Sequence, residues 1–356
     1  MNNNNQYAND KRYRKSNKKK IGKLRLFVYF IIFELLFSVA TAPIIVYYGP
    51  FTNLKKMVVG AAMSSYSHQY LATLFLSKSQ INKIRYGGVT SNTTHQSNKQ
   101  EDVSQINTNT NDSSIELRKV QGGIKFNGLM MVIHNPTKVK VGYSKFLGKQ
   151  GETTSTIAKE FNAIAAINGG GFTDQAQNTT AEYTGTGAFP EGLVISNGKV
   201  VYPKSNIDYN KEIAGDVVGI TNRGVLIVGR YSINYLLNNN VTDALTFGPI
   251  LILNGIAQTK DDSGNNIDSQ GPAPRTAIGQ RKDGAILLLV IDGRQGLQAG
   301  ATIKEVQDIM VQEGAYNAIN LDGGASTTMY YNGQVLNNPS DKFGERPIPT
   351  IFYVSN

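Results

Sequence analysis

The chain has 356 residues, a formal net charge of +10 and no cysteine, which excludes disulfide bonds and a thiol nucleophile. Residues 1–25 hold nine Lys or Arg and one Asp, a net charge of +8, so the basic character belongs to a tail and does not predict nucleic-acid binding. The three histidines, His68, His95 and His134, lack ligand-like spacing, which disfavours a histidine metal site or a Ser-His-Asp triad.

An apolar segment follows the tail. Residues 26–48 are long enough to cross a bilayer as a helix. Basic residues before such a span place the N-terminus in the cytoplasm and the C-terminal domain outside the cell. We therefore expect a cytoplasmic tail at 1–25 and a single-pass transmembrane signal anchor at 26–48 in the cell membrane. A cleaved signal peptide is the alternative, because Ala40-Thr41-Ala42 resembles a cleavage site; Pro43 and the apolar residues after it favour a retained anchor.

Two segments of different composition come next. Residues 49–86 carry apolar side chains at helical spacing and are predicted to form a helical stalk. Residues 87–114 are rich in Asn, Ser, Thr and Gln, which predicts a flexible linker. Residues 115–356 remain, enough for a hydrophobic core without disulfide bonds. An exported chain without cysteine favours a Gram-positive bacterial surface.

The segment 115–356 alternates short strands, glycine-rich turns and a few helices, which predicts an α+β domain with a mixed sheet. Residues 192–202 and 327–336 are each predicted to form a β-hairpin. Their turns, Asn197-Gly198 and Asn332-Gly333, suit the type I′ geometry that tight hairpins prefer.

A strand–helix–strand unit is predicted near the C-terminus. Its strands are 285–291 and 317–321, and its helix is 303–313, opened by a capping box of Thr302 and Glu305. If the two strands are parallel, their carboxyl ends lie at the same edge of the sheet, where open α/β sheets bind ligands. Asp292 and Asp322 follow these two ends directly.

The turn after the second strand has the composition of a binding site. Gly323 and Gly324 can take positive φ and admit a ligand to the backbone, and Ser326 and Thr327 supply hydroxyl groups. A tight turn in which Asp322 bonds its own backbone is the alternative.

Other polar residues stand at predicted strand ends or beside glycine. These are Asn168, Glu191, Asn254, Arg275, Thr276, Arg294 and Asn320. The planar guanidinium of arginine suits phosphate, although Arg294 could instead form an ion pair with Asp292. Two carboxylates and two guanidiniums near one edge suit the cleavage of a bond between a sugar and a phosphate.

One loop is rich in oxygen ligands. Asp261, Asp262, Asn265 and Asp268 could bind calcium, but their spacing differs from that of an EF-hand, and a solvated loop is the alternative. We expect no required cofactor.

Five motifs occur in order along the chain. They are Asn168-Gly169-Gly170-Gly171-Phe172, Glu191-Gly192-Leu193-Val194-Ile195-Ser196-Asn197-Gly198, Pro274-Arg275-Thr276-Ala277-Ile278-Gly279, Asp292-Gly293-Arg294 and Asn320-Leu321-Asp322-Gly323-Gly324-Ala325-Ser326-Thr327-Thr328. Together they resemble the phosphodiester glycosidase family. That family is named for N-acetylglucosamine-1-phosphodiester α-N-acetylglucosaminidase and includes bacterial members called exopolysaccharide-biosynthesis-related.

The resemblance covers residues 115–356 and implies a catalytic domain that hydrolyses sugar-1-phosphodiesters. We expect an extracytoplasmic hydrolase that cleaves the sugar C1–O bond in surface glycopolymers or exopolysaccharide, with Asp292 and Asp322 as catalytic residues and no metal. The predicted substrate-binding residues are Asn168, Glu191, Arg275, Thr276, Arg294, Asn320, Gly323, Gly324, Ser326 and Thr327. The expected partners are a glycan-phosphate or cell-wall polymer and, through the N-terminal helix, the membrane.

Two other functions stay open. One is a non-catalytic module that binds glycans or wall polymers. The other is a metal-dependent phosphodiesterase with Asp292 and Asp322 as ligands.

Overall fold

The structure, a computed structural model, describes residues 22–63, 69–86, 101–174, 185–205, 207–261, 264, 266–267 and 270–356. The chain divides into two compact units, one ending at Phe51 and the other beginning at Thr52. Five residues considered above lie outside the described residues: His68, His95, Asp262, Asn265 and Asp268. The calcium loop therefore stays a prediction.

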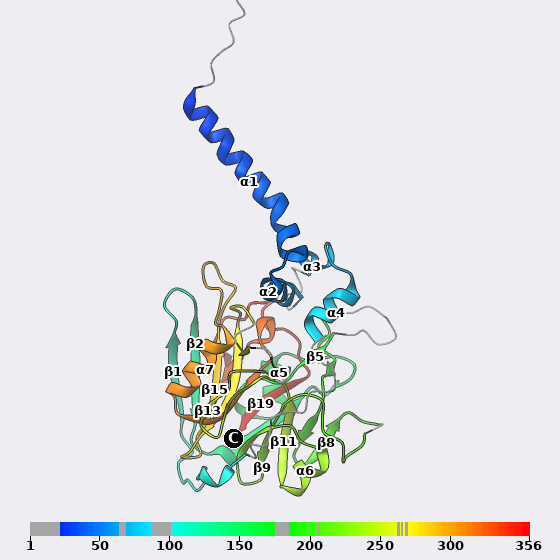
Figure 1. The fold of residues 1–356 in the computed structure, drawn as a ribbon. Coiled ribbons are helices and arrows are strands. Elements are labelled where there is room, and N and C mark those ends of the chain that lie inside the picture. Colours follow the sequence, from blue (N-terminus) through cyan, green and yellow to red (C-terminus); the bar gives the residue numbers. More distant parts are fainter. Residues whose placement is uncertain are drawn as a thin grey trace, which may run out of the picture. The chain divides into compact units, whose positions relative to one another are not determined.

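The first unit contains a single long helix in its described part. Helix α1 (Lys23–Tyr48, Figure 1) covers the predicted apolar span. Most of its large apolar side chains are exposed. Among the described helices it alone is long and apolar enough to cross a membrane. A signal sequence meets the same criteria of length and composition, so α1 fits either an anchor or a signal sequence.

The second unit opens with the segment predicted as a stalk. Its described residues form three helices, α2 (Thr52–Met63), α3 (Tyr70–Thr73) and α4 (Lys78–Tyr86).

The second half of the predicted linker, residues 101–114, makes contacts with the domain. The partly buried carboxylate of Glu101 accepts hydrogen bonds from Val228 N at 3.0 Å, Tyr231 Oη at 2.8 Å and Asn317 Nδ2 at 2.6 Å. Burial raises the pKa of Glu101 to about 8 against the opposing effect of these bonds. Ile106 is also buried. The domain therefore reaches back past the predicted boundary at residue 115, because a few acidic and apolar side chains hold this polar segment.

A seven-stranded sheet carries most of the domain, with the order β1-β2-β15-β14-β16-β12-β13. Its strands are β1 (Ile115–Gln121), β2 (Asn127–Ile133), β15 (Ile286–Ile291), β14 (Arg275–Arg281), β16 (Ala315–Leu321), β12 (Ile250–Leu253) and β13 (Ile256–Ala257). Every pairing described in this sheet is antiparallel.

Two five-stranded sheets and a strand pair complete the β structure. One sheet has β10 (Leu226–Gly229), β9 (Val217–Thr221), β11 (Val241–Thr246), β7 (Val194–Ser196) and β8 (Lys199–Tyr202). The other has β18 (Gln334–Val335), β17 (Met329–Tyr331), β4 (Ala163–Asn168), β19 (Thr350–Ser355) and β3 (Val139–Tyr143). The pair is β5 (Phe172–Thr173) with β6 (Phe189–Pro190).

The remaining elements are short helices. They are α5 (Thr154–Glu160), α6 (Ile233–Asn238), α7 (Ile303–Gln312), and the 3₁₀ turns η1 (Val103–Gln105), η2 (Pro136–Lys138) and η4 (Gly324–Ser326). Both predicted hairpins are confirmed as β7–β8 and β17–β18. Asn197, Gly198, Asn332 and Gly333 all have positive φ, as type I′ turns require.

Strand β15 shows why the seven-stranded sheet is buried on both faces. Ile286, Leu288 and Val290 pack into the core shared with the two five-stranded sheets. Leu287 and Leu289 alternate with them and pack against α7 on the other face. The uninterrupted apolar sequence follows from this two-sided burial.

The strand–helix–strand unit is present, with one addition. Helix α7 has the predicted capping box of Thr302 and Glu305. Strand β14 lies between β15 and β16 and is antiparallel to both, so β15 and β16 run in the same direction without being neighbours. Their carboxyl ends share one end of the sheet, which we call the site end.

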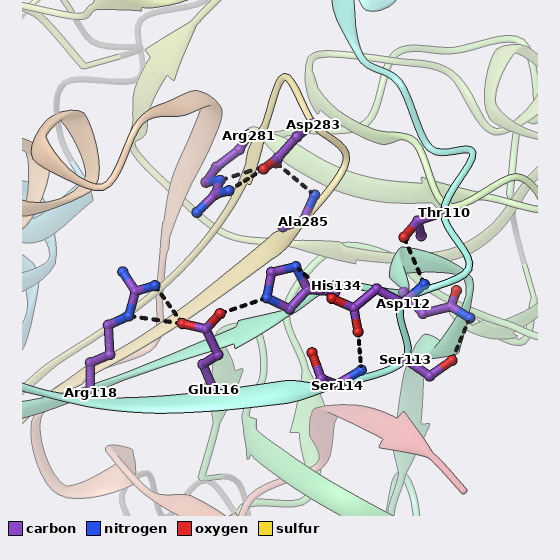
Figure 2. Close-up of polar contacts among 11 residues, drawn as sticks. Thr110, Asp112, Ser113, Ser114, Glu116, Arg118, His134, Arg281, Asp283 and Ala285 are labelled. Carbon is purple, nitrogen blue, oxygen red and sulfur yellow. Dashed lines mark hydrogen bonds and ion pairs between the residues drawn. The ribbon is translucent and has the colours of Figure 1, made fainter.

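A polar cluster holds the opposite end of the sheet. His134, after β2, has Nε2 at 2.9 Å from Glu116 Oε1 and Nδ1 at 3.6 Å from Asp112 Oδ2. Figure 2 shows the imidazole between these two carboxylates, with Arg118 on the far side of Glu116. The carboxylates engage both ring nitrogens, so His134 fastens the segment before β1 to the sheet.

Candidate active site

The candidate site lies where the end of β4 meets the site end of the large sheet. Asp322 N donates to Gly169 O at 3.2 Å, which joins the turn after β16 to the turn after β4. Thr276, near the start of β14, is paired with Leu321. Three of the five sequence motifs therefore meet here, although they are far apart in the chain.

Asn168 ties these segments together. Its amide Nδ2 donates to Asp322 O at 2.5 Å. Its Oδ1 accepts from Thr276 Oγ1 at 2.7 Å and from Thr328 N at 3.1 Å. Asn168 and Thr276 are fully buried. Both were predicted to bind substrate, and the structure shows them holding the framework around Asp322.

The surroundings of Asp322 alter the pKa of its carboxyl group. Burial raises its pKa from an ordinary 3.8 to about 6. The Ser326 hydroxyl and the positive charge of Arg346 oppose this rise, and the negative charge of Glu191 adds to it. Oδ1 accepts from Gly323 N at 3.0 Å, so the turn-forming bond predicted as the alternative is present. Asp322 therefore combines the turn-forming bond with a raised pKa, and raised carboxylate pKa values are frequent at functional sites.

Two arginines lie within electrostatic range of Asp322. Burial lowers the pKa of Arg294, the nearby charge of Arg346 lowers it further, and Asp322 raises it. Arg294 has φ of +59°, a left-handed conformation that is uncommon for a side chain of this size and is often found at functional sites. The two guanidiniums bring positive charge to this end of the sheet, and the carboxylates of Asp322, Glu191 and Asp174 bring negative charge to it.

Arg346 and Asp174 were missed by sequence reasoning. Arg346 forms an ion pair with Asp174, whose Oδ1 also accepts from Gly187 N at 2.8 Å. The Arg346 guanidinium lies 4.8 Å from the centroid of the Phe172 ring. Asp174 comes two residues after the motif that ends in Phe172, which is the one local signal that could have indicated it.

Asp292 is held in a separate network at the same end of the sheet. Its Oδ1 accepts from Asn337 Nδ2 at 2.9 Å and from Asn338 N at 3.2 Å. Burial raises its pKa, and the Asn337 bond opposes the rise. Asn337 Nδ2 also donates to Thr327 O at 3.1 Å, which links this network to the Asp322 turn. Because β14 intervenes, two strand spacings separate the two aspartate backbones, roughly 10 Å.

The turn after Asp322 matches its prediction in part. Gly324 has φ of +62°, as expected. Gly323 is extended at φ −122°, and glycine is needed there because a Cβ would lie 2.7 Å from Pro274 O.

Buried polar atoms without a hydrogen-bond partner among the described residues gather around this turn. Asn320 Oδ1, Thr327 Oγ1 and Thr328 Oγ1 are three of them. Asn320 Nδ2 is occupied, because it donates to Gly248 O at 2.9 Å. Such atoms are rare in folded proteins, and their concentration beside Asp322 supports a polar ligand at this place.

Two predicted site residues have other surroundings. Asn254 follows β12, whose end points away from the site end, and its Oδ1 accepts from Asp102 N at 2.9 Å. Arg275 is buried and donates to Ala301 O at 3.1 Å, to Gln270 Oε1 at 3.0 Å and to Gly271 O at 2.6 Å. Its guanidinium was expected to hold phosphate, but these bonds fasten the loop before β14.

We therefore expect Arg275→Lys to lower stability more than substrate affinity. A lysine cannot reproduce three differently directed bonds, and each lost bond to a charged donor costs about 1.5–3 kcal/mol. Urea denaturation and KM should be measured on the same preparation. A large rise in KM at unchanged stability would instead restore the phosphate-binding role.

The arrangement supports one kind of chemistry. The two guanidiniums can bind phosphate oxygens, and above pH 6 most of the Asp322 carboxylate is ionised and able to act as a base or nucleophile. Asp292, held by Asn337 and Asn338 at the same end of the sheet, supplies a second carboxyl group.

Comparison with known proteins identifies the family and the fold. Residues 161–355 match the model of the phosphodiester glycosidase family, and the chain belongs to that family. The fold is that of the zebrafish N-acetylglucosamine-1-phosphodiester alpha-N-acetylglucosaminidase catalytic domain auto-inhibited by pro-peptide, with a TM-score of 0.58, 24% identity, and coverage of 70% of this chain and 86% of that one.

Curated relatives match over part of their length. The SPbeta prophage-derived uncharacterized protein YomE of Bacillus subtilis (strain 168) is 25% identical over 56% of this chain and 29% of its own length. The N-acetylglucosamine-1-phosphodiester alpha-N-acetylglucosaminidase of Bos taurus is 29% identical over 54% of this chain and 36% of its own length. The chain thus spans about a third of these relatives.

Proposed function

We propose that this protein is a hydrolase that cleaves the sugar C1–O bond of glycosyl-1-phosphodiesters. The main observation behind this proposal is that Asp322, a carboxylate with a raised pKa, lies within electrostatic range of Arg294 and Arg346. Membership of the phosphodiester glycosidase family and the names of two of the relatives support this class of reaction.

In the proposed reaction, Arg294 and Arg346 bind the phosphate and orient the sugar C1 toward Asp322. The Asp322 carboxylate either attacks C1 or removes a proton from an attacking water, and the phosphate monoester leaves. Asp292 donates a proton to the leaving oxygen where that is needed. A phosphate monoester is already a good leaving group, so the acid contributes less than in an ordinary glycosidase.

Isotope-labelled water tests the site of cleavage. The detergent-solubilised full chain is incubated with a panel of synthetic sugar-1-phosphodiesters in ¹⁸O water. Label in the C1 hydroxyl of the released sugar is the expected result. Label in the phosphate would indicate a phosphodiesterase that cleaves P–O. Retention of a wall polymer without turnover of any substrate would indicate a binding module.

We further propose that α1 is a retained anchor and that the substrate is a glycan-phosphate polymer outside the cell. The basic tail before α1 supports this orientation. Protease added to intact cells should digest the C-terminal domain and leave a small N-terminal fragment in the membrane. Mature protein in the medium that begins at Pro43 would show that α1 is a cleaved signal peptide.

A further inference from the structure

Three loops at the site end of the seven-stranded sheet each expose one large apolar side chain. Ile124 in the β1–β2 turn is 82% exposed, Leu297 after β15 is 90% exposed, and Phe343 before β19 is 81% exposed. They are the three most exposed large apolar side chains in the part of the chain that the structure describes. We call them the apolar rim. A single exposed apolar side chain is ordinary on a protein surface, whereas several on connected loops can form an interaction surface.

Hydrogen bonds between the loops place the rim residues on the same end of the domain. Gly300 N donates to Lys125 O at 3.1 Å, which joins the Leu297 loop to the β1–β2 turn. Gln295 Nε2 donates to Asn338 O at 2.6 Å, which joins the Leu297 loop to the segment that leads to Phe343. The rim therefore belongs to one connected set of loops.

The Phe343 and Leu297 side chains project from defined turns. The Phe343 turn is closed by Asp341, whose Oδ1 accepts from Phe343 N at 3.0 Å and whose backbone oxygen accepts from Gly344 N at 3.1 Å. The Leu297 turn is closed by a reciprocal backbone pair between Gln295 and Gln298, at 3.0 and 2.9 Å. Local hydrogen bonding thus holds these two turns in conformations that leave the side chains in solvent.

We propose that the apolar rim inserts into the surface of a phospholipid bilayer. Its composition favours hydrocarbon over carbohydrate, because Ile124 and Leu297 are aliphatic and offer a sugar neither a hydrogen bond nor an aromatic face. Lys342 stands next to Phe343, with its ammonium 4.7 Å from the centroid of the ring. Lys125 stands next to Ile124, and its ammonium pairs with Glu305 at 2.8 Å. Lysines beside inserted apolar groups reach the charged headgroups.

The chain itself supplies a reason for a bilayer to be near. It contains α1, a helix long and apolar enough to cross a membrane. The inference goes beyond the proposed hydrolysis and does not depend on it, because it concerns a surface and not a reaction. If it holds, the end of the sheet that carries Asp292 and Asp322 works next to lipid.

The absence of tryptophan from the sequence makes this proposal directly testable. The full chain is reconstituted in phosphatidylcholine nanodiscs with a single tryptophan from Phe343→Trp, Leu297→Trp or Ile124→Trp. Brominated acyl chains quench tryptophan that reaches the acyl boundary, so emission from the rim variants should fall about two-fold or more against ordinary lipid.

Tyr235→Trp is the matched control. Tyr235 is 42% exposed on α6, and its ring stacks at 4.9 Å on Tyr231, which bonds Glu101 at the opposite end of the large sheet. Its emission should be the same in both lipids. The use of three exposed rim positions keeps the test valid if one variant folds poorly.

Three results would overturn the proposal. Equal emission of the rim variants in ordinary and brominated lipid would show that the rim stays in water. Equal quenching of the Tyr235→Trp control would show non-specific contact of the domain with lipid. A rim signal that responds only to a water-soluble glycan-phosphate polymer would make the rim a polymer-binding surface.

Discussion

Asp322→Asn should lower turnover by about two to four orders of magnitude, the usual contribution of a general acid–base group. Asparagine keeps the size of the side chain and can accept the bond from Gly323 N, so the turn should survive. It removes the negative charge that a base or nucleophile needs. The rate should be measured on a synthetic sugar-1-phosphodiester, with circular dichroism as the check on folding.

Asp308→Asn is the control for this change. Asp308 lies on α7 with its side chain 51% exposed and pairs with Lys304 at the surface, so its substitution should leave turnover unchanged. Near-normal turnover in Asp322→Asn would show that Asp322 only stabilises the turn.

The pH dependence of kcat/KM and of stability tests the role of Asp322 independently. With a pKa of about 6, kcat/KM should fall about ten-fold for each pH unit below 6 and level off above it. The contribution of Asp322 to stability falls as the pH rises, because its pKa in the folded protein lies above the ordinary 3.8. The stabilising contribution is complete below about pH 3.8 and is lost as the pH rises through 6. Asp322→Asn should therefore gain stability relative to the parent at pH 8 but not at pH 3.

Arg346→Gln should destabilise the domain by about 3–5 kcal/mol, the usual cost of leaving one partner of a buried ion pair uncompensated. The Asp174 side chain is only 3% exposed and would lose its guanidinium partner. The change should also move the acidic limb of the pH–rate profile upward, because the charge of Arg346 lowers the pKa of Asp322. Urea denaturation and the pH profile measure these two effects separately.

Arg118→Gln provides a comparison within the same chain. Arg118 also pairs with a carboxylate, Glu116, but the two side chains are 45% and 42% exposed. Solvent screens such a pair, so the loss should be at most about 1 kcal/mol. A loss for Arg346→Gln no larger than for Arg118→Gln, with an unchanged pH profile, would remove Arg346 from the site.

The parts of the fold that depend on local sequence could be predicted. The two Asn-Gly turns set their own backbone conformation, and the α7 capping box needs only residues three positions apart. The common direction of β15 and β16 was also expected, although the insertion of β14 between them was not. Strand order depends on pairings between distant residues, which periodicity does not encode.

The site was harder to predict because residue type does not reveal a side chain's partners. Arg275 has the right chemistry for phosphate, but three of its five N–H donors bond to Ala301, Gln270 and Gly271. Arg346, in contrast, gave no local signal and reaches the site through a contact with Asp174, which is 172 residues away in the chain.

The position of β19 has a consequence for the order in which the protein matures. This strand, Thr350–Ser355, lies between β4 and β3 in its sheet. Thr350 O accepts from Gly169 N at 2.9 Å, directly beside the framework of Asn168. Residues 350–355 must therefore be in place before the turn after β4, next to Asn168, gains this support. The surroundings of Asn168 thus depend on a strand that lies far along the chain.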